Sequence, residues 1–502
     1  MKKKFFYITT PIYYPSAKPH MGHAYSSISA DVIARFYRMD DYDVRFVTGT
    51  DEHGQKIEKS AIQAGLEPLE FCNKISKVFH ELTGILNLSN SDFIRTTEKR
   101  HVETVQKLWS ILEKSGHIYL SKYSGWYSVS DEAFYSESEI ADEGNVKICK
   151  ATGSKVEWVE EDSYFFRLSQ FQDKLLEFYE KNPSFISPNS RRNEVISFVK
   201  NGLKDLSISR TSFNWGIEVP NDKKHIMYVW LDALTNYLTA SNYFSKNSFW
   251  PADLHIIGKD ILRFHAIYWP AFLIAAKIPL PKKVFGHGWI LSGDEKMSKS
   301  KGNILDPIEI IKEYGLDEIR YYLMKEVIYG LDGKINIDNL KNCINSDLAN
   351  NIGNLSQRIF ALVQKYFSSK VPNNEEYNNN EIKLVDIDLE LFRSSMHNLE
   401  IHNYVREIIN YSSHINKYIN DEEPWSKIKT NNKRVSTVLN VGLNALKNIF
   451  ILLHPIIPKK SEIFLNTLNI SNNNISLKLI NERISTDMLI NRPEILFKKF
   501  DM

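Results

Sequence analysis

Short β-rich runs alternate with helical patterns in the first hundred residues, and this alternation limits the chain to a small set of folds. Runs of β-branched and aromatic residues at 5–10 and 44–48 flank a helical pattern at 24–38. A strand, a crossing helix and a second strand form the βαβ unit of a parallel sheet. The same style returns at 254–258, before a helical pattern at 261–272. We therefore predict an α/β fold whose Rossmann-like parallel sheet is split in the sequence.

Residues 118–224 differ in character, since aromatic-rich short strands are mixed with helical pieces, and we interpret them as a connective insertion. Beyond residue 345 the pattern is helical to about residue 466, and the asparagine-rich stretch 373–380 predicts an exposed loop. The expected division is a first catalytic half at 1–117, the insertion at 118–224, a second catalytic half at 225–295, a loop region at 296–345 and a helical domain at 346–502.

Composition excludes several classes. A chain of 502 residues is too long for one hydrophobic core, and 43% hydrophobic residues exclude a disordered protein. The net charge of +2 means that attraction to nucleic acid must come from local patches. Three distant cysteines fit a reducing cytosol. Prolines interrupt the apolar run after the basic N-terminus, and no stretch approaches the ~20 apolar residues of a membrane span. We expect a soluble, cytoplasmic protein that does not bind a membrane.

The first strand is followed by His20-Met21-Gly22-His23, which leads directly into a helical pattern. The N-terminus of a helix suits polyphosphate because its backbone N–H groups are unpaired and its dipole end is positive. Gly22 would let a nucleotide approach closely. His20 and His23 could donate hydrogen bonds to phosphate oxygens as charge develops at phosphorus. The alternative is two capping or partly exposed histidines, and the tetrapeptide alone favours that alternative.

A second phosphate-binding pattern lies at 293–302, where a glycine-bounded loop carries three lysines and two serines. Ammonium groups act as mobile charges for phosphate, and a loop can close after ATP has bound. The alternative is a solvated basic surface loop. Asp306, Pro307 and Glu309 then predict the start of a helix, with Asp306 as the N-cap and Pro307 at the first position.

Together, the two motifs resemble the HIGH and KMSKS signatures of class I aminoacyl-tRNA synthetases. His20-Met21-Gly22-His23 follows a first strand, and Lys296-Met297-Ser298-Lys299-Ser300 follows the last part of the split sheet. Two signatures in this order are far more specific than either alone. The resemblance implies catalysis by His20, His23, Lys296 and Lys299 without a covalent intermediate on the protein, because phosphoryl displacement needs positioning and charge stabilisation.

Segments 48–54, 228–237, 258–261, 264–265 and 423–425 resemble the methionyl-tRNA synthetase family, most closely its shorter single-chain forms. The resemblance implies activation of L-methionine by ATP, with transfer to the 3′-terminal ribose of tRNA(Met), initiator and elongator. Asp51 would pair with the substrate ammonium, and an aromatic wall suits a thioether. The implied methionine-binding residues are Ile12, Tyr14, Asp51, His53, Trp230, Ala233, Leu234, Tyr237, Ile261, Phe264 and His265. Taken singly, these aromatic residues are more often core residues.

The implied ATP site combines both signatures with two further segments, and the nucleotide would enter as its Mg²⁺ complex. Gly258, Lys259 and Asp260 would hold adenine and ribose, and a strand at 287–291 would line the adenine through its backbone. The full set is His20, Gly22, His23, Gly258, Lys259, Asp260, His287, Gly288, Trp289, Ile290, Lys296, Ser298 and Lys299.

The sequence departs from the family at the zinc knuckle that many members carry in the insertion. The positions of the C-x2-C pairs read Ser128 and Asp131, then Cys149 and Thr152. A single thiol with these neighbours cannot make a tetrahedral thiolate site, so we expect no bound zinc. The insertion is also shorter than the editing domain of the leucine, isoleucine and valine enzymes, an inference from analogy.

In the helical part, Asn354 and Arg358 are four residues apart and share a helix face. With Trp425 they resemble the residues that read the CAU anticodon, so 346–502 would be an all-α anticodon-binding bundle and 296–345 the KMSKS loop and stem-contact region. The alternative is a surface pair plus a core tryptophan. We expect a monomer, since the dimerising module of some relatives is missing.

Three other functions remain open. A class I synthetase for another amino acid would have the same signatures, and pyrophosphate exchange across all amino acids would separate the two. A free-standing nucleotidyltransferase would not need the long helical part. An inactive RNA-binding relative is disfavoured by the intact histidine and lysine motifs.

Overall fold

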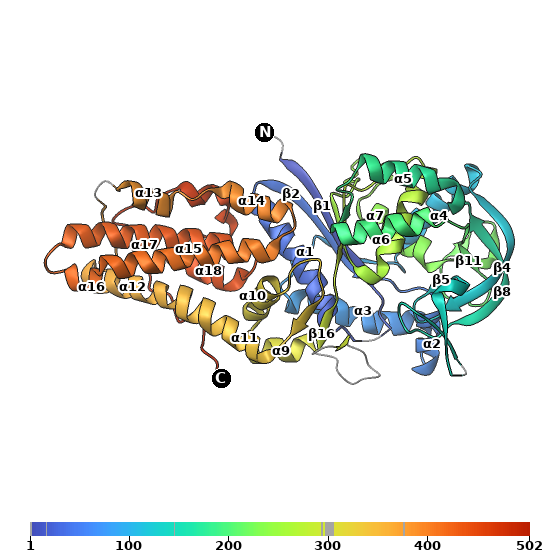
Figure 1. Ribbon diagram of the computed structural model, residues 1–502, viewed down its shortest axis with the longest axis horizontal. Helices are drawn as coiled ribbons and strands as arrows, with labels where there is room; N and C mark the ends of the chain where they lie inside the picture. The colour runs from blue at the N-terminus through green and yellow to red at the C-terminus, as the bar shows by residue number, and fades with distance from the viewer. Residues whose placement is uncertain are drawn as a thin grey trace. The chain divides into compact units, whose positions relative to one another are not determined.

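The computed structural model describes residues 3–501 except 17, 145, 293–294, 297–305 and 375–376, and it leaves out the side chains of 292, 295 and 296 (Figure 1). The chain divides into two compact units. The sheet unit comprises Phe6–Pro19 and Arg45–His287, and the helical unit comprises Met1–Phe5, His20–Val44 and Gly288–Met502. Each unit is described by itself.

A six-stranded sheet with the order β3-β2-β1-β14-β15-β9 organises the sheet unit. The strands are β1 Lys4–Tyr13, β2 Tyr42–Thr50, β3 Asp92–Arg95, β9 Ile186–Ser187, β14 Leu254–Gly258 and β15 Val284–His287. β1 is parallel to β14, β14 to β15, β15 to β9, and β2 to β3. The prediction of an α/β fold with a split parallel sheet is confirmed, and the two-residue strand β9 from the insertion forms one edge.

The insertion forms antiparallel sheets of its own. The longest pairing joins β4 (Ile118–Ser128) to β8 (Glu157–Phe166), from Ile118 opposite Phe166 to Tyr127 opposite Glu157. The remaining strands are β5 Ala133–Tyr135, β6 Ile140–Glu143, β7 Val146–Cys149, β10 Leu206–Ser207, β11 Ser209–Arg210, β12 Glu218–Val219 and β13 Asp222–Met227. Antiparallel strands can be joined by short connections, as β6 and β7 are, whereas α5 and α6 lie between β8 and its partner β10.

Helices complete the sheet unit. They are α2 Gln55–Gln63, α3 Pro68–Ile85, α4 Lys99–Lys114, α5 Gln172–Lys181, α6 Asn189–Lys200, α7 Val229–Ala240 and α8 Trp269–Ala275. The continuous helix expected at 261–272 is interrupted, since a 3₁₀ turn at Lys259–Ile261 is followed by a π-helical turn at Phe264–Tyr268. Such π turns are frequent at functional sites.

The helical unit contains α1 (Met21–Met39) and the C-terminal helices. These are α9 Pro307–Tyr314, α10 Leu316–Glu326, α11 Ile337–Cys343, α12 Asn354–Tyr366, α13 Asn379–Val385, α14 Leu389–His397, α15 Ile401–Glu422, α16 Pro424–Lys427, α17 Asn432–Leu453 and α18 Pro458–Thr467, with a π-helical segment at Ile344–Gly353. Figure 1 shows α15 and α17 side by side. The helical C-terminal region is therefore confirmed.

Within the described residues, one helix is long and apolar enough to cross a membrane by length and composition. This helix is α17, with a mean hydropathy of 1.4 over 18 residues, and 94% of that window is buried. The expectation that no stretch approaches this length is thus corrected. Burial identifies α17 as the core helix of its unit, in which the buried polar residues Asn440, Asn444 and Lys447 donate hydrogen bonds to backbone carbonyls.

Two further sequence predictions change in detail. The strand expected at 287–291 is two strands, because β15 ends at His287 and β16 (Ile290–Ser292) pairs with β18 (Gly333–Ile335). The loop expected through Asn380 ends earlier, because α13 begins at Asn379. Asn378 caps this helix by accepting hydrogen bonds from the backbone N–H groups of Asn380 and Glu381.

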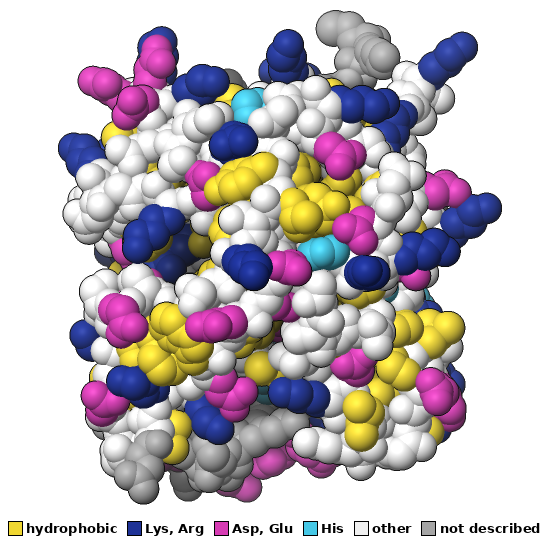
Figure 2. All heavy atoms as spheres, turned by 90° about the vertical axis from the view of Figure 1, so that its right-hand side faces the viewer, with side chains coloured by type: hydrophobic (Ala, Val, Ile, Leu, Met, Phe, Trp, Pro, Cys, Tyr) yellow, Lys and Arg dark blue, Asp and Glu magenta, His cyan; other side chains and the backbone are white. Residues whose placement is uncertain are grey.

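The surface charges are mixed. Figure 2 shows one face on which Lys and Arg side chains are interspersed with Asp and Glu side chains, and no single sign of charge covers that face. This distribution agrees with the near-neutral balance of 63 basic and 61 acidic residues.

A buried ion pair fastens α1 to the C-terminal helices of the helical unit. Arg320 on α10 lies 2.6 Å from Asp31, and both side chains are fully buried. Arg320 also donates hydrogen bonds to the carbonyls of Pro455 and Ile456. The guanidinium therefore has carboxylate and carbonyl partners that offset its desolvation.

We expect Arg320→Met to lower the stability of the chain by about 3 kcal/mol, because it removes the fully buried cationic partner of the Asp31 carboxylate. Differential scanning calorimetry of the full chain measures this as a lowered transition temperature. The matched control is Arg393→Met, which breaks the partly exposed pair with Asp40 and should cost about 1 kcal/mol or less. Equal losses in the two variants would contradict the burial argument.

Candidate active site

The carboxyl ends of β1 and β2 place Tyr14, Asp51 and His53 together. The backbone N–H of Asp51 donates to the carbonyl of Tyr13 at 2.9 Å. The hydroxyl of Tyr14 donates to the carbonyl of His53 at 2.6 Å. Ligands of parallel α/β sheets bind at this edge, so these predicted residues stand where the fold favours a site. Ile12 lies half-buried near the end of β1.

A buried carboxylate on α7, Asp232, is held between two histidines. His53 Nδ1 lies 2.6 Å from one carboxylate oxygen, and His101 Nε2 lies 2.7 Å from the other. Burial opposes ionisation, but the interactions with His53 and His101 outweigh it and lower the pKa of Asp232 to about 2. Asp232 is therefore ionised at neutral pH, and its negative charge fixes the orientation of the His53 ring.

The second buried carboxyl group at this edge, Asp51, has a pKa shifted in the opposite direction. Asp51 is only 6% exposed, and its Oδ1 atom has no hydrogen-bond partner among the described residues. Burial raises the pKa of Asp51 well above its usual range, and the nearby carboxylates of Asp232 and Glu132 raise it further. A cationic ligand is the partner that would favour the ionised form.

Aromatic rings line the neighbouring part of the sheet unit. Trp230 and Phe264 are stacked, with ring centroids 3.7 Å apart and planes 5° apart. Both pack in one apolar cluster with Leu234, Tyr237 and Ile261, while Ala233 is buried on the same helix. The structure thus brings together the aromatic and apolar residues that the sequence predicted for one pocket.

His265 is neutral and held in one tautomer. Burial lowers the pKa of His265 to about 4. Its Nδ1 atom lies 3.0 Å from the carbonyl of Ile261, which can only accept, so Nδ1 carries the proton. Its Nε2 atom then accepts a hydrogen bond from the hydroxyl of Tyr237 at 2.7 Å. The imidazole is thereby a fixed polar element of the aromatic wall.

In the helical unit, His20 and His23 cap α1 reciprocally. The backbone N–H of Gly22 donates to His20 Nδ1 at 3.1 Å, and that of His20 donates to His23 Nδ1 at 3.0 Å. Burial lowers the pKa of His23 well below its usual value, and the charge of His20 lowers it further. Because each Nδ1 accepts, the proton of each neutral ring is on Nε2. The capping alternative and the donor function are therefore compatible.

Gly22 is required by crowding within the motif itself. A Cβ atom at this position would lie 2.9 Å from Cε1 of the His20 ring. The absence of a side chain therefore lets His20 cap the helix. The close approach of a nucleotide, expected from the sequence, remains a separate prediction.

The other predicted nucleotide-binding residues lie at two chain reversals. In the sheet unit, Gly258 ends β14, and a Cβ atom there would lie 2.6 Å from the Asp260 carboxylate. Lys259 is half-buried, and His287 is buried at the end of β15. In the helical unit, a Cβ atom at Gly288 would lie 2.2 Å from the backbone of Leu331.

The residues after Gly288 continue this backbone approach. The N–H of Trp289 donates to Asp332 at 2.8 Å, and Ile290 pairs with Gly333. Of the predicted KMSKS residues, Lys296 has only its backbone described, in strand β17 (Glu295–Lys296). Ser298 and Lys299 lie outside the described residues. The predicted N-cap is confirmed, since Asp306 accepts from the N–H of Ile308 at 2.8 Å.

The predicted anticodon residues meet on the surface of the helical unit. The guanidinium of Arg358 lies 4.9 Å from the centre of the Trp425 ring and donates to Asn420 at 2.7 Å. Trp425 is 44% exposed, so it is not the core residue of the alternative interpretation. Asn354 is exposed one helical turn before Arg358 on α12. The arrangement offers an aromatic face and polar groups to solvent.

Sequence reasoning missed His101, which lies 131 residues from its partner Asp232. It also missed Trp215, whose ring contacts His53 edge-on and whose Nε1 donates to the Glu52 carbonyl at 2.6 Å. The Glu52 carboxylate accepts two hydrogen bonds from Arg95, so it fastens β2 to β3. No local pattern marks these partners, because each contact joins distant segments.

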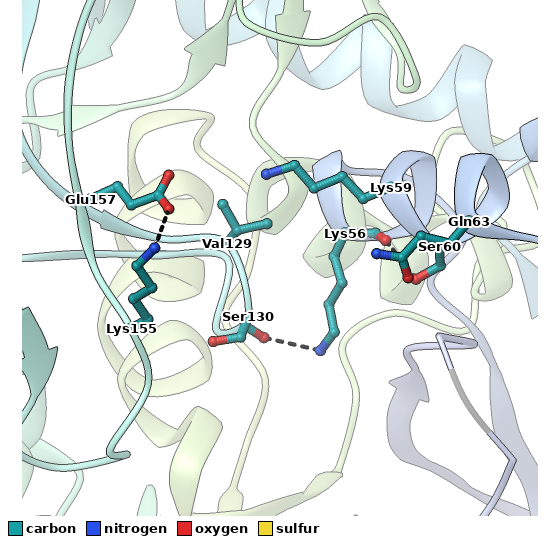
Figure 3. A pocket seen from close by; sticks show the side chains of 8 residues that line it. All are labelled: Lys56, Lys59, Ser60, Gln63, Val129, Ser130, Lys155 and Glu157. Atoms are coloured by element: carbon teal, nitrogen blue, oxygen red, sulfur yellow. Dashed lines mark hydrogen bonds and ion pairs between the residues drawn. The ribbon is translucent and has the colours of Figure 1, made fainter. Parts of the chain in front are cut away.

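A surface cavity of about 300 Å³ lies beside α2 (Figure 3). Its lining residues are Lys56, Lys59, Ser60, Gln63, Val129, Ser130, Lys155 and Glu157. None of them belongs to the predicted site.

Among the described residues, no group of three or more His, Cys, Asp or Glu side chains could hold a metal ion. At the knuckle positions, the Asp131 carboxylate instead accepts hydrogen bonds from Tyr135, Thr152 and Ser154 at 2.6–2.8 Å. These bonds join the segment after β4 to the segment after β7.

Two protein families match most of the chain. The family described as "tRNA synthetases class I (M)" matches residues 6–360, and the "Anticodon binding domain of methionyl tRNA ligase" matches residues 371–501. The chain therefore belongs to the class I aminoacyl-tRNA synthetases, as its parallel sheet and histidine motif indicate.

Relatives narrow the assignment. The chain is 50% identical to a methionine–tRNA ligase of Rickettsia felis over 99% of both chains, and 48% identical to one of Brucella suis over 93% of this chain and 92% of that one. A solved Mycobacterium tuberculosis methionyl-tRNA synthetase in complex with methionyl-adenylate matches with a TM-score of 0.96 and 44% identity, covering 98% of this chain and 99% of that one. The chain belongs to the methionyl-tRNA synthetase family.

Proposed function

We propose that the chain activates L-methionine with ATP, forming methionyl-adenylate and pyrophosphate, and then transfers methionine to the 3′-terminal ribose of tRNA(Met), initiator and elongator. The observation that carries this proposal is the buried carboxyl group of Asp51, one oxygen of which has no hydrogen-bond partner among the described residues. The same unit contains the stacked rings of Trp230 and Phe264, which offer an aromatic wall. A zwitterionic amino acid with an apolar side chain needs both elements.

Methionine binding assigns roles to the eleven predicted residues. Asp51 pairs with the substrate ammonium. His53, fixed by Asp232, orients polar groups beside it. Trp230 and Phe264 pack against the thioether, with Ile12, Tyr14, Ala233, Leu234, Tyr237 and Ile261 completing the pocket and His265 as its neutral polar element. Shape alone discriminates side chains by ~1–3 kcal/mol per methylene, so fixed aromatic rings set the selectivity.

In the activation step, a carboxylate oxygen of methionine forms a bond to the α-phosphorus of ATP, and the bond to pyrophosphate breaks. His20 and His23 donate through Nε2–H to oxygens that gain charge, and Lys296 and Lys299 stabilise the departing pyrophosphate. The nucleotide enters as its Mg²⁺ complex, and the residues proposed to hold it are Gly22, Gly258, Lys259, Asp260, His287, Gly288, Trp289, Ile290 and Ser298.

In the transfer step, a ribose hydroxyl attacks the methionyl carbonyl and AMP leaves.

The domain roles follow the expected boundaries. We propose catalytic halves at 1–117 and 225–295, the insertion at 118–224, the KMSKS loop and stem contacts at 296–345 and anticodon binding at 346–502. We also propose that the insertion binds no zinc, since hydrogen bonds of Asp131 join the knuckle segments, and that the protein acts as a cytoplasmic monomer without a membrane.

The proposal is tested by ATP–pyrophosphate exchange measured with each of the proteinogenic amino acids in turn. Methionine should give the fastest exchange, because Asp51 would pair with its ammonium and the aromatic wall suits its thioether. Charging of a tRNA(Met) transcript should follow in the same preparation. Exchange that is fastest with another amino acid would instead support the alternative, a class I synthetase of other specificity.

Trp425→Ala should separate the two steps. We expect it to lower kcat/KM for tRNA charging by about tenfold or more, the loss of one stacked base, while pyrophosphate exchange keeps its wild-type rate. Trp158→Ala is the matched control, because Trp158 is exposed to a similar degree, 49% against 44%, but lies on β8 of the insertion. Loss of exchange in Trp425→Ala would show that the tryptophan is structural.

Methionine affinity should depend on pH through Asp51. The pKa of Asp51 is raised in the free protein, so below that pKa methionine must displace a proton before the ammonium can pair with the carboxylate. Affinity should therefore strengthen as pH rises through the raised pKa. Isothermal titration over a series of pH values, from the ordinary range of an Asp carboxyl group at about pH 4 up to neutral pH, measures this dependence. Asp51→Asn should weaken binding by about tenfold or more and abolish the acid-side dependence. A wild-type affinity that is independent of pH would contradict the raised pKa.

A further inference from the structure

Glu132, in the insertion, has a conformation that requires explanation. It lies between β4 and β5, is only 4% exposed and has a φ of 48°, a left-handed conformation that a glutamate rarely adopts. Its backbone carbonyl accepts a hydrogen bond from the hydroxyl of Tyr228 at 2.8 Å. A strained backbone conformation persists only where the surrounding structure holds it in place, and such positions cluster at functional sites.

The Glu132 carboxylate faces the beginning of α2. The N-cap of this helix is Gly54, which offers no side chain to satisfy the first backbone N–H groups. Oε1 of Glu132 accepts from the N–H of Lys56, the second residue of the helix, at 3.0 Å. A carboxylate at this position also interacts favourably with the helix dipole. Glu132 thus caps α2 from another part of the chain.

The same oxygen lies 3.1 Å from the hydroxyl of Tyr14. Tyr14 in turn donates to the carbonyl of His53, one residue before Gly54. A Cβ atom at Gly54 would lie 2.5 Å from this hydroxyl and 2.9 Å from Oε1, so glycine is required for the approach. One oxygen therefore contacts both the helix that follows the segment 51–54 and the tyrosine that donates to His53. This segment carries Asp51 and His53.

A second link joins the same two elements. The ammonium of Lys56 donates to the carbonyl of Ser130 at 3.0 Å, and Figure 3 shows this side chain reaching from α2 to the insertion beside the cavity. On its other side, Oε2 of Glu132 accepts from the hydroxyl of Tyr127, a residue of the insertion itself. The carboxylate is therefore shared between the insertion, the beginning of α2 and Tyr14.

We propose that Glu132 is a positioning residue for methionine: by capping α2 and contacting Tyr14, it fixes the segment 51–54 in the conformation that aims Asp51 at the substrate ammonium. The inference rests on the proposed methionine-activating function. It gives the insertion a role in the amino-acid site through contacts within the sheet unit.

The test compares Glu132→Ala with Tyr127→Phe in the full chain. Isothermal titration measures methionine affinity without ATP, and pyrophosphate exchange measures KM for ATP. Glu132→Ala should weaken methionine binding by about tenfold or more, with KM for ATP within about twofold of wild type. Tyr127→Phe removes only the insertion-side bond and should leave methionine affinity within about twofold. Unchanged methionine affinity in Glu132→Ala, or an equal loss in Tyr127→Phe, would overturn the inference.

Two conservative variants keep the test decisive if Glu132→Ala does not fold. Glu132→Gln keeps an oxygen that can accept from Lys56 and should retain most of the affinity. Glu132→Asp is too short to reach Lys56 and Tyr14 together and should lose affinity, with a melting temperature near that of wild type. Wild-type affinity in Glu132→Asp would refute the positioning role. Failure of the wild-type protein itself to bind methionine would instead refute the proposed function.

Discussion

Two buried carboxyl groups at the carboxyl end of the parallel sheet, Asp51 and Asp232, are the constraint around which the sheet unit is organised. Asp232 has two histidine partners, and the pKa of its carboxyl group lies at about 2. Asp51 has no comparable cationic partner, and burial together with the charge of Asp232 raises its pKa. When two carboxyl groups share one low-dielectric region, their pKa values are separated in this way. The histidine partners favour the ionised form of Asp232, whereas a cationic ligand would be needed to favour that of Asp51.

In the histidine motif, the structural role of each ring is compatible with its proposed chemical role. Each imidazole accepts a backbone N–H at the start of α1, which is the ordinary work of an N-cap. This acceptance fixes the proton of each neutral ring on Nε2, and the low pKa of His23 keeps that ring neutral. The rings are therefore pre-organised donors, which costs no reorganisation when charge develops on a phosphate.

Much of the fold and of the site was predictable from the sequence, and the remainder depends on long-range contacts. The bounds of β14 were predicted to the residue, because β-branched residues between turn signals identify a buried strand. The break between β15 and β16 was not, because it arises where Gly288 packs against the backbone of Leu331. Likewise, Asp51 was identified from its motif, but His101 and Glu132 were not, since their partners lie on other segments. Periodicity records which face is buried and contains no information about which distant side chain meets it.

An unpartnered buried atom does not by itself mark a site. Within the part of the chain that the structure describes, the indole nitrogens of Trp109, Trp230 and Trp269 also lack a hydrogen-bond partner. For a neutral N–H, burial without a partner costs about 1–3 kcal/mol, which a large core can absorb. A carboxylate in the same situation costs more, and protonation avoids that cost. Because protonation is reversed when an ammonium arrives, the free energy of restoring the charge becomes part of the binding step. Asp51 differs from the tryptophans in this respect, and in the proposed function its buried position next to Asp232 would couple recognition of an amino group to the loss of a proton.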